Sequence, residues 1–189
     1  MSLAALIAST RKVLAGDATK GHAVFAAEGT LVGVTEVDIR TGAHSFKVDE
    51  PASVGGANVA ANPVQYALAS LGACQAITYR IWAAQLGIDL DTVTVRVEGD
   101  LDLRGCLGVD DTVRPGLSAV RVEVTVAGPE SEERYAELAA AVDEHCPVLD
   151  LFQNPVPVSR ELVTSGLDTR QPAPRGAAGD DSGYEASEA

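Results

Sequence analysis

Three cysteines, Cys74, Cys106 and Cys146, are the residues of this 189-residue sequence best suited to nucleophilic chemistry. An odd number of cysteines at such long spacings does not predict a disulfide framework. It does not predict a zinc site either, because no Cys-x-x-Cys pair occurs and His145 beside Cys146 lacks ligand spacing. In a reducing compartment, thiols that matter usually act through their reactivity. The first question is therefore which of the three thiols reacts.

Cys74 falls inside the clearest predicted helix of the chain. Asn62 suits the N-cap, Pro63 the first helical position, and Gly87 the C-terminal end. The side chains between them are apolar nearly all round, which predicts a central buried helix, and a second subunit is one source of cover. Cys74 lies about three turns into the helix, beyond the reach of the helix dipole. It is either an inert packing thiol or a thiolate stabilised by a cation from elsewhere in the fold.

Three arginines are candidates for that cation. Arg80 is six residues from Cys74, which places it on the wrong side of the helix. Arg11 is a second candidate, near the N-terminus. Arg40, at the end of a predicted strand, is the preferred one, with Glu50 as the acid that holds its guanidinium in place.

Cys146 closes a second predicted helix, which begins near residues 129–131. Pro147 pushes the residue before it out of helical geometry and ends the helix there. The side chains of His145 and Cys146 would point about 100° apart on a helix, so a Cys–His nucleophilic pair is not expected. Cys106 falls in a long loop and is interpreted as incidental.

Alternating apolar residues and Gly-containing turns predict strands around these helices. The turns Glu28-Gly29 and Thr41-Gly42 would make the first three strands an antiparallel meander, and the next two strands would pair antiparallel. The expected strands cover residues 23–25, 31–39, 44–48, 92–97, 120–126 and about 156–163. The order β-β-β-α-β-β-α-β predicts an α+β fold of mostly antiparallel sheets.

Composition narrows the classes of partner. A net charge of −13 and an aromatic content of 4% disfavour nucleic-acid binding. No apolar stretch reaches the roughly 18–20 residues of a membrane span, and no signal peptide is recognised, so a cytoplasmic protein is expected. The Gly-rich loop over 51–61 lacks the ending of a P-loop, and neither a cofactor nor a metal is expected.

The chain is expected to contain one folded domain. Residues 1–20 would be an N-terminal segment, with a short helix allowed near its start, and the domain would cover 21–165. Residues 166–189 are rich in Gly, Ala, Ser, Pro and acids, which predicts a disordered acidic tail.

Several motifs together resemble the family of osmotically inducible protein C and organic hydroperoxide resistance proteins (OsmC/Ohr). These are Gly55-Gly56, Asn62-Pro63, Cys74 twelve residues past that Asn, and Cys146-Pro147 at the end of a second helix. The fit extends over Asp49–Leu162. The resemblance implies an intertwined α+β homodimer with active sites at the subunit interface.

The same resemblance implies thiol-dependent reduction of organic hydroperoxides, alkyl or lipid. Cys74 would be the peroxidatic cysteine, which forms a sulfenic acid, and Cys146 would resolve it to an intramolecular disulfide. An external dithiol would reduce that disulfide. Arg40 and Glu50 are assigned by region as the residues that activate Cys74. A non-enzymatic protein that senses redox state or binds a small apolar ligand remains the alternative, whereas a thiol hydrolase would need a general base that no His supplies.

Overall fold

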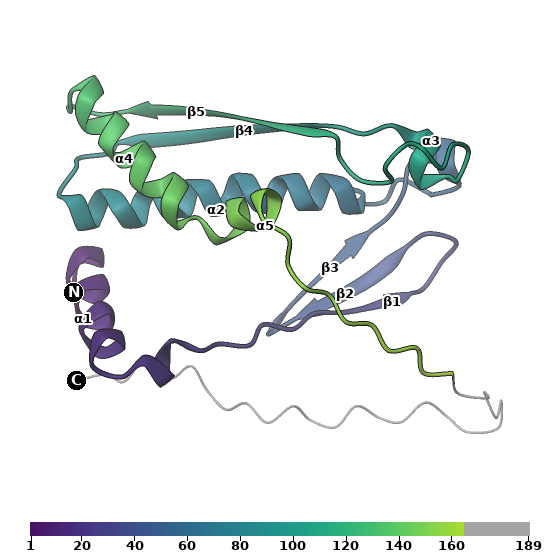
Figure 1. Cartoon of the computed structure of the whole chain (residues 1–189), viewed down its shortest axis with the longest axis horizontal. Helices are drawn as coiled ribbons and strands as arrows, with labels where there is room; N and C mark the ends of the chain where they lie inside the picture. The colour runs from purple at the N-terminus through teal and green to yellow at the C-terminus, as the bar shows by residue number, and fades with distance from the viewer. Residues whose placement is uncertain (165–189) are drawn as a thin grey trace. The chain divides into compact units, whose positions relative to one another are not determined.

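The computed structural model describes residues 1–164, and the helices and strands of Figure 1 all lie within its first unit, Met1–Val156. A second unit begins at Pro157, and the acidic tail predicted over 166–189 lies outside the described residues. Two 3-10 turns, η1 (Ala18–Gly21) and η2 (Ala52–Val54), connect larger elements. Those are α1 (Leu3–Gly16), β1 (Glu28–Leu31), β2 (Val37–Thr41), β3 (His44–Val48), α2 (Pro63–Leu86), β4 (Thr92–Asp100), α3 (Leu103–Cys106), β5 (Ala119–Ala127), α4 (Glu132–His145) and α5 (Pro147–Gln153).

Helix α2 begins and ends as its sequence predicts. The Asn62 side chain accepts from the Gln65 backbone N–H at 2.8 Å, and the Gln65 side chain accepts from the Asn62 N–H at 2.9 Å. This reciprocal capping box, with Pro63 at the first position, satisfies N–H groups that have no partner within the helix. Gly87 ends the helix with φ 62°, in the left-handed region that suits glycine. No helix among residues 1–164 is long and apolar enough to cross a membrane.

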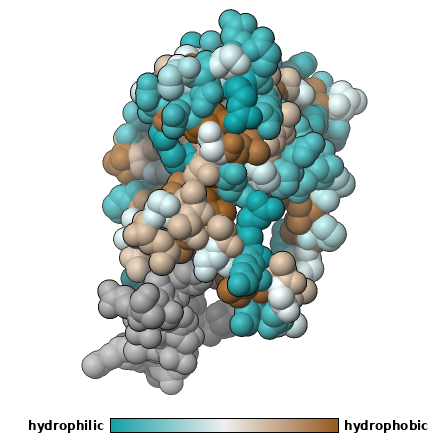
Figure 2. All heavy atoms as spheres, turned by 90° about the vertical axis from the view of Figure 1, so that its left-hand side faces the viewer, coloured by the Kyte–Doolittle hydropathy of each residue, from teal (hydrophilic) through white to brown (hydrophobic). Residues whose placement is uncertain are grey.

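Burial of α2 within one chain is one-sided. The buried positions share one face of the helix, and they are Leu71, Gln75, Thr78, Tyr79 and Ala83. On the other side Ile77 remains 60% exposed. Figure 2 shows other hydrophobic side chains that reach the surface between hydrophilic ones. The described residues of one chain therefore do not bury α2 all round, because α1, β4, α4 and α5 together cover only part of its circumference.

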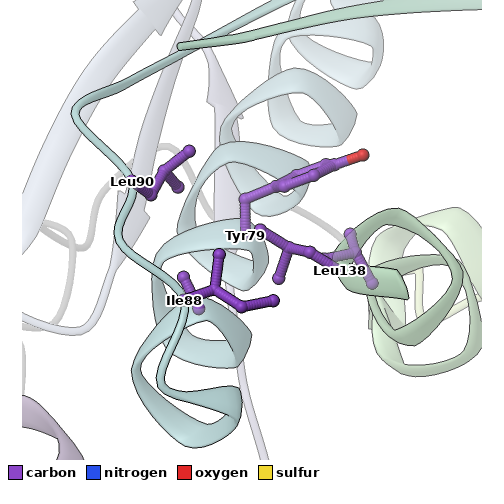
Figure 3. Close-up of a cluster of buried hydrophobic side chains, with 6 residues drawn as sticks. Tyr79, Ile88, Leu90 and Leu138 are labelled. Carbon is purple, nitrogen blue, oxygen red and sulfur yellow. The ribbon is translucent and has the colours of Figure 1, made fainter. Parts of the chain in front are cut away.

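The buried core joins α2 to α4. Tyr79 of α2 packs near Ile88 and Leu90, in the segment that leads to β4, and near Leu138 of α4 (Figure 3). Ala83 and Val142 complete the cluster of buried side chains. This core fixes α4, and therefore the residue at its C-terminal end, against the middle of α2.

Both sheets are antiparallel, which confirms the predicted α+β class. One has the order β1-β2-β3 and the other pairs β4 with β5. The predicted turn at Thr41-Gly42 joins β2 to β3, where Gly42 has φ 54°. The second sheet has the predicted antiparallel pairing, and in it Val95 lies opposite Val124 and Val97 opposite Val122.

The first turn of the meander was predicted in the wrong place. Residues 23–25 form no strand, and Gly29, expected in a turn, lies within β1 opposite Ile39. The actual turn interrupts the strand predicted over 31–39, and there the Val32 N–H donates to the Glu36 carbonyl oxygen at 2.8 Å. Gly29 serves close cross-strand packing instead, since a Cβ there would lie 3.0 Å from the Ile39 side chain.

The C-terminal end of the fold differs from the sequence prediction in two ways. The strand expected at about 156–163 is absent from the described residues, where Val156, Val158 and Leu162 are exposed. Alternation of apolar residues gives a strand only where a neighbouring edge is free to pair, and no described strand pairs with this segment. Helix α5 was not predicted, because Pro147 was interpreted only as the end of α4, whereas it also begins α5.

Candidate functional site

The sulfurs of Cys74 and Cys146 lie together although 72 positions separate them in the sequence. The Cys146 thiol donates to the Cys74 Sγ over 3.4 Å, and both cysteines are free thiols. Cys74 lies in the middle of α2, and Cys146 lies at the junction of α4 and α5. Two thiols at this separation can form a disulfide with only a small movement, because a disulfide bond is about 2.05 Å long.

Local sequence explains how Cys146 reaches α2. Leu138, Val142 and Cys146 recur every four residues, so they share one face of α4. Each is at most 2% exposed. Pro147 forces Cys146 out of the helix to φ −84° and ψ 108°, as its position predicts. His145, by contrast, is exposed, and its ring lies against Trp82 with a centroid distance of 4.2 Å.

The surroundings of the pair raise the pKa of Cys146. Burial, followed by the neighbouring Cys74, raises the pKa of Cys146, and the backbone N–H groups of Leu149 and Val148 oppose that rise only in part. Cys146 is therefore a protonated thiol at neutral pH and the hydrogen-bond donor. Cys74 is then the acceptor, and its sulfur is the candidate nucleophile.

We expect Cys146 to ionise later than an ordinary thiol. In Cys106→Ser protein, ultraviolet thiolate absorbance followed against pH should contain a step above the ordinary thiol value that is missing in the Cys106→Ser, Cys146→Ser protein. The raised pKa of Cys146 is the reason. Loss of a step at or below neutral pH would contradict the assignment of Cys146 as the donor.

The structure does not bring Arg40 to the thiol pair. Arg40 is exposed on β2, opposite Ser45 of β3. Among residues 1–164, no hydrogen bond or ion pair joins it to Cys74 or Glu50. The other candidate arginines have partners elsewhere. Arg11 donates to the Gln85 side chain, and Arg80 donates to the Leu90 and Asp91 carbonyl oxygens.

Glu50 lies at an apolar cavity of about 610 Å³ beside the N-terminal end of α2. Among residues 1–164 it is the only carboxylate in the cavity wall, which also contains Cys106, Val64 and Leu117. Cys106 donates to the Leu103 carbonyl oxygen over 3.4 Å and does not contact the other two cysteines. In the described part of the chain, no group of three or more His, Cys, Asp or Glu side chains is placed to hold a metal ion.

Sequence reasoning missed Asp49, a buried carboxylate that fixes the loop around Glu50. Its oxygens accept from the Thr35 hydroxyl at 2.6 Å and from the backbone N–H groups of Ala57 and Val59 at 3.0 and 3.2 Å. These hydrogen bonds, the one from Thr35 above all, lower the pKa of Asp49 to about 2. No pattern in the sequence marks this residue, because its partners come from two separate loops.

The Gly55-Gly56 motif allows the loop around Glu50 to fold back closely on itself. A Cβ at Gly56 would lie 1.7 Å from the Glu50 carbonyl oxygen, so only glycine allows this approach. Asn58 N–H donates to that oxygen at 3.1 Å. The loop thereby holds the backbone of Glu50 at the start of α2.

We expect Asp49→Asn to make the protein less stable at neutral pH but not at about pH 2. A lowered pKa means that Asp49 contributes its stability fully above the ordinary value of 3.8 and loses it as the pH falls toward about 2. Urea unfolding midpoints of the two proteins should therefore converge between pH 7 and pH 2. The exposed Asp38 gives the matched control, and an equal effect of Asp38→Asn would contradict the role of Asp49.

Solved structures share this arrangement of elements. An OsmC-like protein from Mycoplasma pneumoniae is 17% identical with a TM-score of 0.61, over 69% of this chain and 88% of that one. An organic hydroperoxide resistance protein OsmC from Legionella pneumophila is 24% identical with a TM-score of 0.54, over 69% of this chain and 90% of that one. An organic hydroperoxide resistance protein from Elizabethkingia anophelis is 21% identical with a TM-score of 0.56, over 70% of this chain and 89% of that one. At these identities the likeness is one of fold, and no curated protein matches the chain.

The family comparison covers both cysteines of the pair. It begins after Arg40 and Glu50, so it contains neither of the two residues assigned by region. Residues 55–161, more than half of the chain, match the family model for OsmC-like protein, and the chain therefore belongs to the OsmC-like family.

Proposed function

We propose that the protein is a thiol-dependent peroxidase that reduces organic hydroperoxides, with Cys74 as the peroxidatic and Cys146 as the resolving cysteine. The observation that carries this proposal is the 3.4 Å contact in which a buried, protonated Cys146 donates to Cys74. A structural role explains the burial of Cys146, but it does not explain why its sulfur meets that of Cys74, 72 positions away in the sequence.

The chemistry balances over two thiols and one peroxide. The Cys74 thiolate attacks a peroxide oxygen, the O–O bond breaks, and the alcohol leaves after it takes up a proton. Cys74 is then a sulfenic acid. Cys146 loses its proton and attacks the Cys74 sulfur, which forms the disulfide and releases water. An external dithiol reduces the disulfide by exchange and is itself oxidised, which restores both thiols.

A count of free thiols tests the proposal directly. One equivalent of cumene hydroperoxide should lower the thiols reactive in denaturant from three per chain to one, and in Cys106→Ser protein from two to none. The remaining thiol should be Cys106, which peptide mapping after alkylation identifies. If all three thiols still react after peroxide treatment, the proposal is wrong.

The homodimer belongs to the same proposal. Two features support it, namely the exposed side of α2 around Ile77 and the unpaired apolar segment at 156–163. A second copy of the chain would cover the exposed side of α2. It would also offer a strand edge with which the segment at 156–163 can pair. Arg40 and Glu50 would then complete the site in the assembled dimer, with Arg40 supplied across the interface.

A second candidate function rests on the cavity at Glu50. Its wall is almost wholly apolar and its volume of about 610 Å³ suits a small organic molecule. A non-enzymatic binding or redox-sensing protein would be stabilised against heat by such a ligand, and Cys74→Ser would not remove that effect. If peroxide turnover depends on Cys74, the protein is instead a peroxidase, and this cavity would be part of its substrate site.

A further inference from the structure

Two adjacent residues at the end of α4 contact α2 at different places along its length. The Cys146 sulfur contacts that of Cys74. The ring of His145 lies against Trp82, which follows Cys74 by eight residues on α2. Eight residues of a helix rise about 12 Å, or roughly two turns. The junction of α4 and α5 is therefore attached to α2 at two separate positions, which restricts its rotation as well as its distance from α2.

The contact between Trp82 and His145 is an aromatic pair. The ring centroids lie 4.2 Å apart, and the ring planes are inclined by 39°. Trp82 is half-buried and packs against the core that contains Leu138 and Val142. His145 is exposed, so its ring covers the outer side of the indole. Aromatic rings at this separation attract each other beyond the effect of the area that they bury.

A hydrogen bond fixes the orientation of the His145 ring. Its Nδ1 donates to the carbonyl oxygen of Ala141, one turn earlier in α4, at 2.8 Å. Histidines near the C-terminal end of a helix commonly bond its last carbonyl groups in this way. The ring is therefore held by its edge on α4 and by its face on α2, directly before Cys146.

Disulfide formation demands accurate placement of Cys146. Its sulfur must approach that of Cys74 from 3.4 Å to about 2.05 Å, and the geometry that allows the bond is narrow. Cys146 itself lies outside both helices, with ψ 108°, and α5 begins at the next residue. The ends of helices are where hinges occur, so a contact made by the residue beside Cys146 strongly affects the position of its sulfur.

We propose that His145 is a positioning residue, which through its contact with Trp82 keeps Cys146 within reach of Cys74. It acts through the backbone of Cys146 and not as a base. As part of the reaction, this role rests on the proposed function, in which Cys146 must meet the sulfenic acid on Cys74 before a second peroxide molecule does. That molecule would oxidise the sulfenic acid to a sulfinic acid and leave as the alcohol.

A glutathione equilibrium measures this positioning without any peroxide. In Cys106→Ser protein, mixtures of reduced and oxidised glutathione set the ratio of disulfide to free thiols in the pair, which alkylation and mass spectrometry measure. Addition of His145→Ala should lower the equilibrium constant about fivefold, the size expected for an aromatic pair. His145→Phe keeps a ring on Trp82 and should restore the constant. Glu144→Ala changes the exposed neighbour in the same turn and should leave the constant unchanged.

Tryptophan fluorescence tests the ring contact itself. Trp82 is the only tryptophan of the chain, so the emission comes from this residue alone. Acrylamide should quench the emission more strongly in His145→Ala protein, because the outer side of the indole is then uncovered, but not in His145→Phe protein. Equal quenching of the unchanged protein and both variants would contradict the contact on which the positioning role depends.

The proposed reaction offers a kinetic readout. With excess cumene hydroperoxide, the ratio of sulfinic acid to disulfide at Cys74 should rise about fivefold in His145→Ala protein, while the rate of the first peroxide reduction stays unchanged. An equal loss in both steps would show a merely structural role and overturn the proposal.

Failure of this inference is distinguishable from failure of the peroxidase proposal. If cumene hydroperoxide oxidises no thiol but the glutathione equilibrium shifts in His145→Ala and returns in His145→Phe, the peroxidase proposal is wrong and the positioning role stands. If peroxide oxidises the thiol pair but His145→Ala keeps the equilibrium constant of the unchanged protein, the positioning role alone is wrong. It is also wrong if Glu144→Ala lowers the constant as much as His145→Ala, because the effect then belongs to α4 as a whole.

Discussion

Cys74→Ser should lower hydroperoxide turnover to the rate of the reaction mixture without protein, whereas Cys146→Ser should still react once. The difference follows from the proposed roles, in which the buried Cys146, a protonated thiol 3.4 Å from the Cys74 sulfur, acts only after Cys74 has reacted. A serine hydroxyl at position 74 is far too weakly acidic to act as the nucleophile, so no oxygen–oxygen bond is broken. Dithiol-coupled consumption of cumene hydroperoxide measures this loss.

The Cys146→Ser protein distinguishes a resolving role from a structural one. After one equivalent of peroxide it should hold a sulfenic acid on Cys74 that dimedone traps, and mass spectrometry should find the adduct on the peptide that contains this residue. The unchanged protein should yield the disulfide instead. A sulfenic acid on Cys146 in Cys74→Ser protein, formed at the rate of the unchanged protein, would reverse the two assignments.

Helix boundaries could be predicted from the sequence because they depend on neighbouring residues. Asn62, Pro63 and Gly87 define the ends of α2 through capping, and Pro147 shapes the backbone at Cys146 by local sterics. The family resemblance rested on these same local motifs. It led to both cysteines that the structure places 3.4 Å apart, although nothing local in either helix predicts that meeting.

Features that depend on distant partners were predicted less well. Gly29 looks like a turn residue until Ile39 packs over it from the neighbouring strand. Asp49 gains its role from Thr35 and from the loop after Gly56, so its importance is visible only once both loops are folded. The segment 156–163 has the alternation of a strand, yet its structure depends on whether a free edge is available.

Mixed dimers should recover activity from two inactive variants if Arg40 acts across the subunit interface. Cys74→Ser and Arg40→Gln should each be close to inactive alone, the first for lack of a nucleophile and the second for lack of its cation. In the described part of one chain, no hydrogen bond joins Arg40 to Cys74, and this is the reason to expect the guanidinium from a second copy.

The recovered rate can be worked out from the symmetry of the proposed dimer. When equal amounts of the Cys74→Ser and Arg40→Gln proteins are unfolded together and refolded, about half of the dimers are mixed. Each mixed dimer holds one complete active site out of two. The rate should therefore reach about a quarter of the wild-type rate. Mixing without unfolding gives the control, because subunits that do not exchange stay inactive. If refolding restores nothing while sedimentation shows mixed dimers, Arg40 does not act from the partner copy. If the Arg40→Gln protein alone reacts at the wild-type rate, Arg40 is not part of the active site, and Cys74 reacts without a guanidinium from β2.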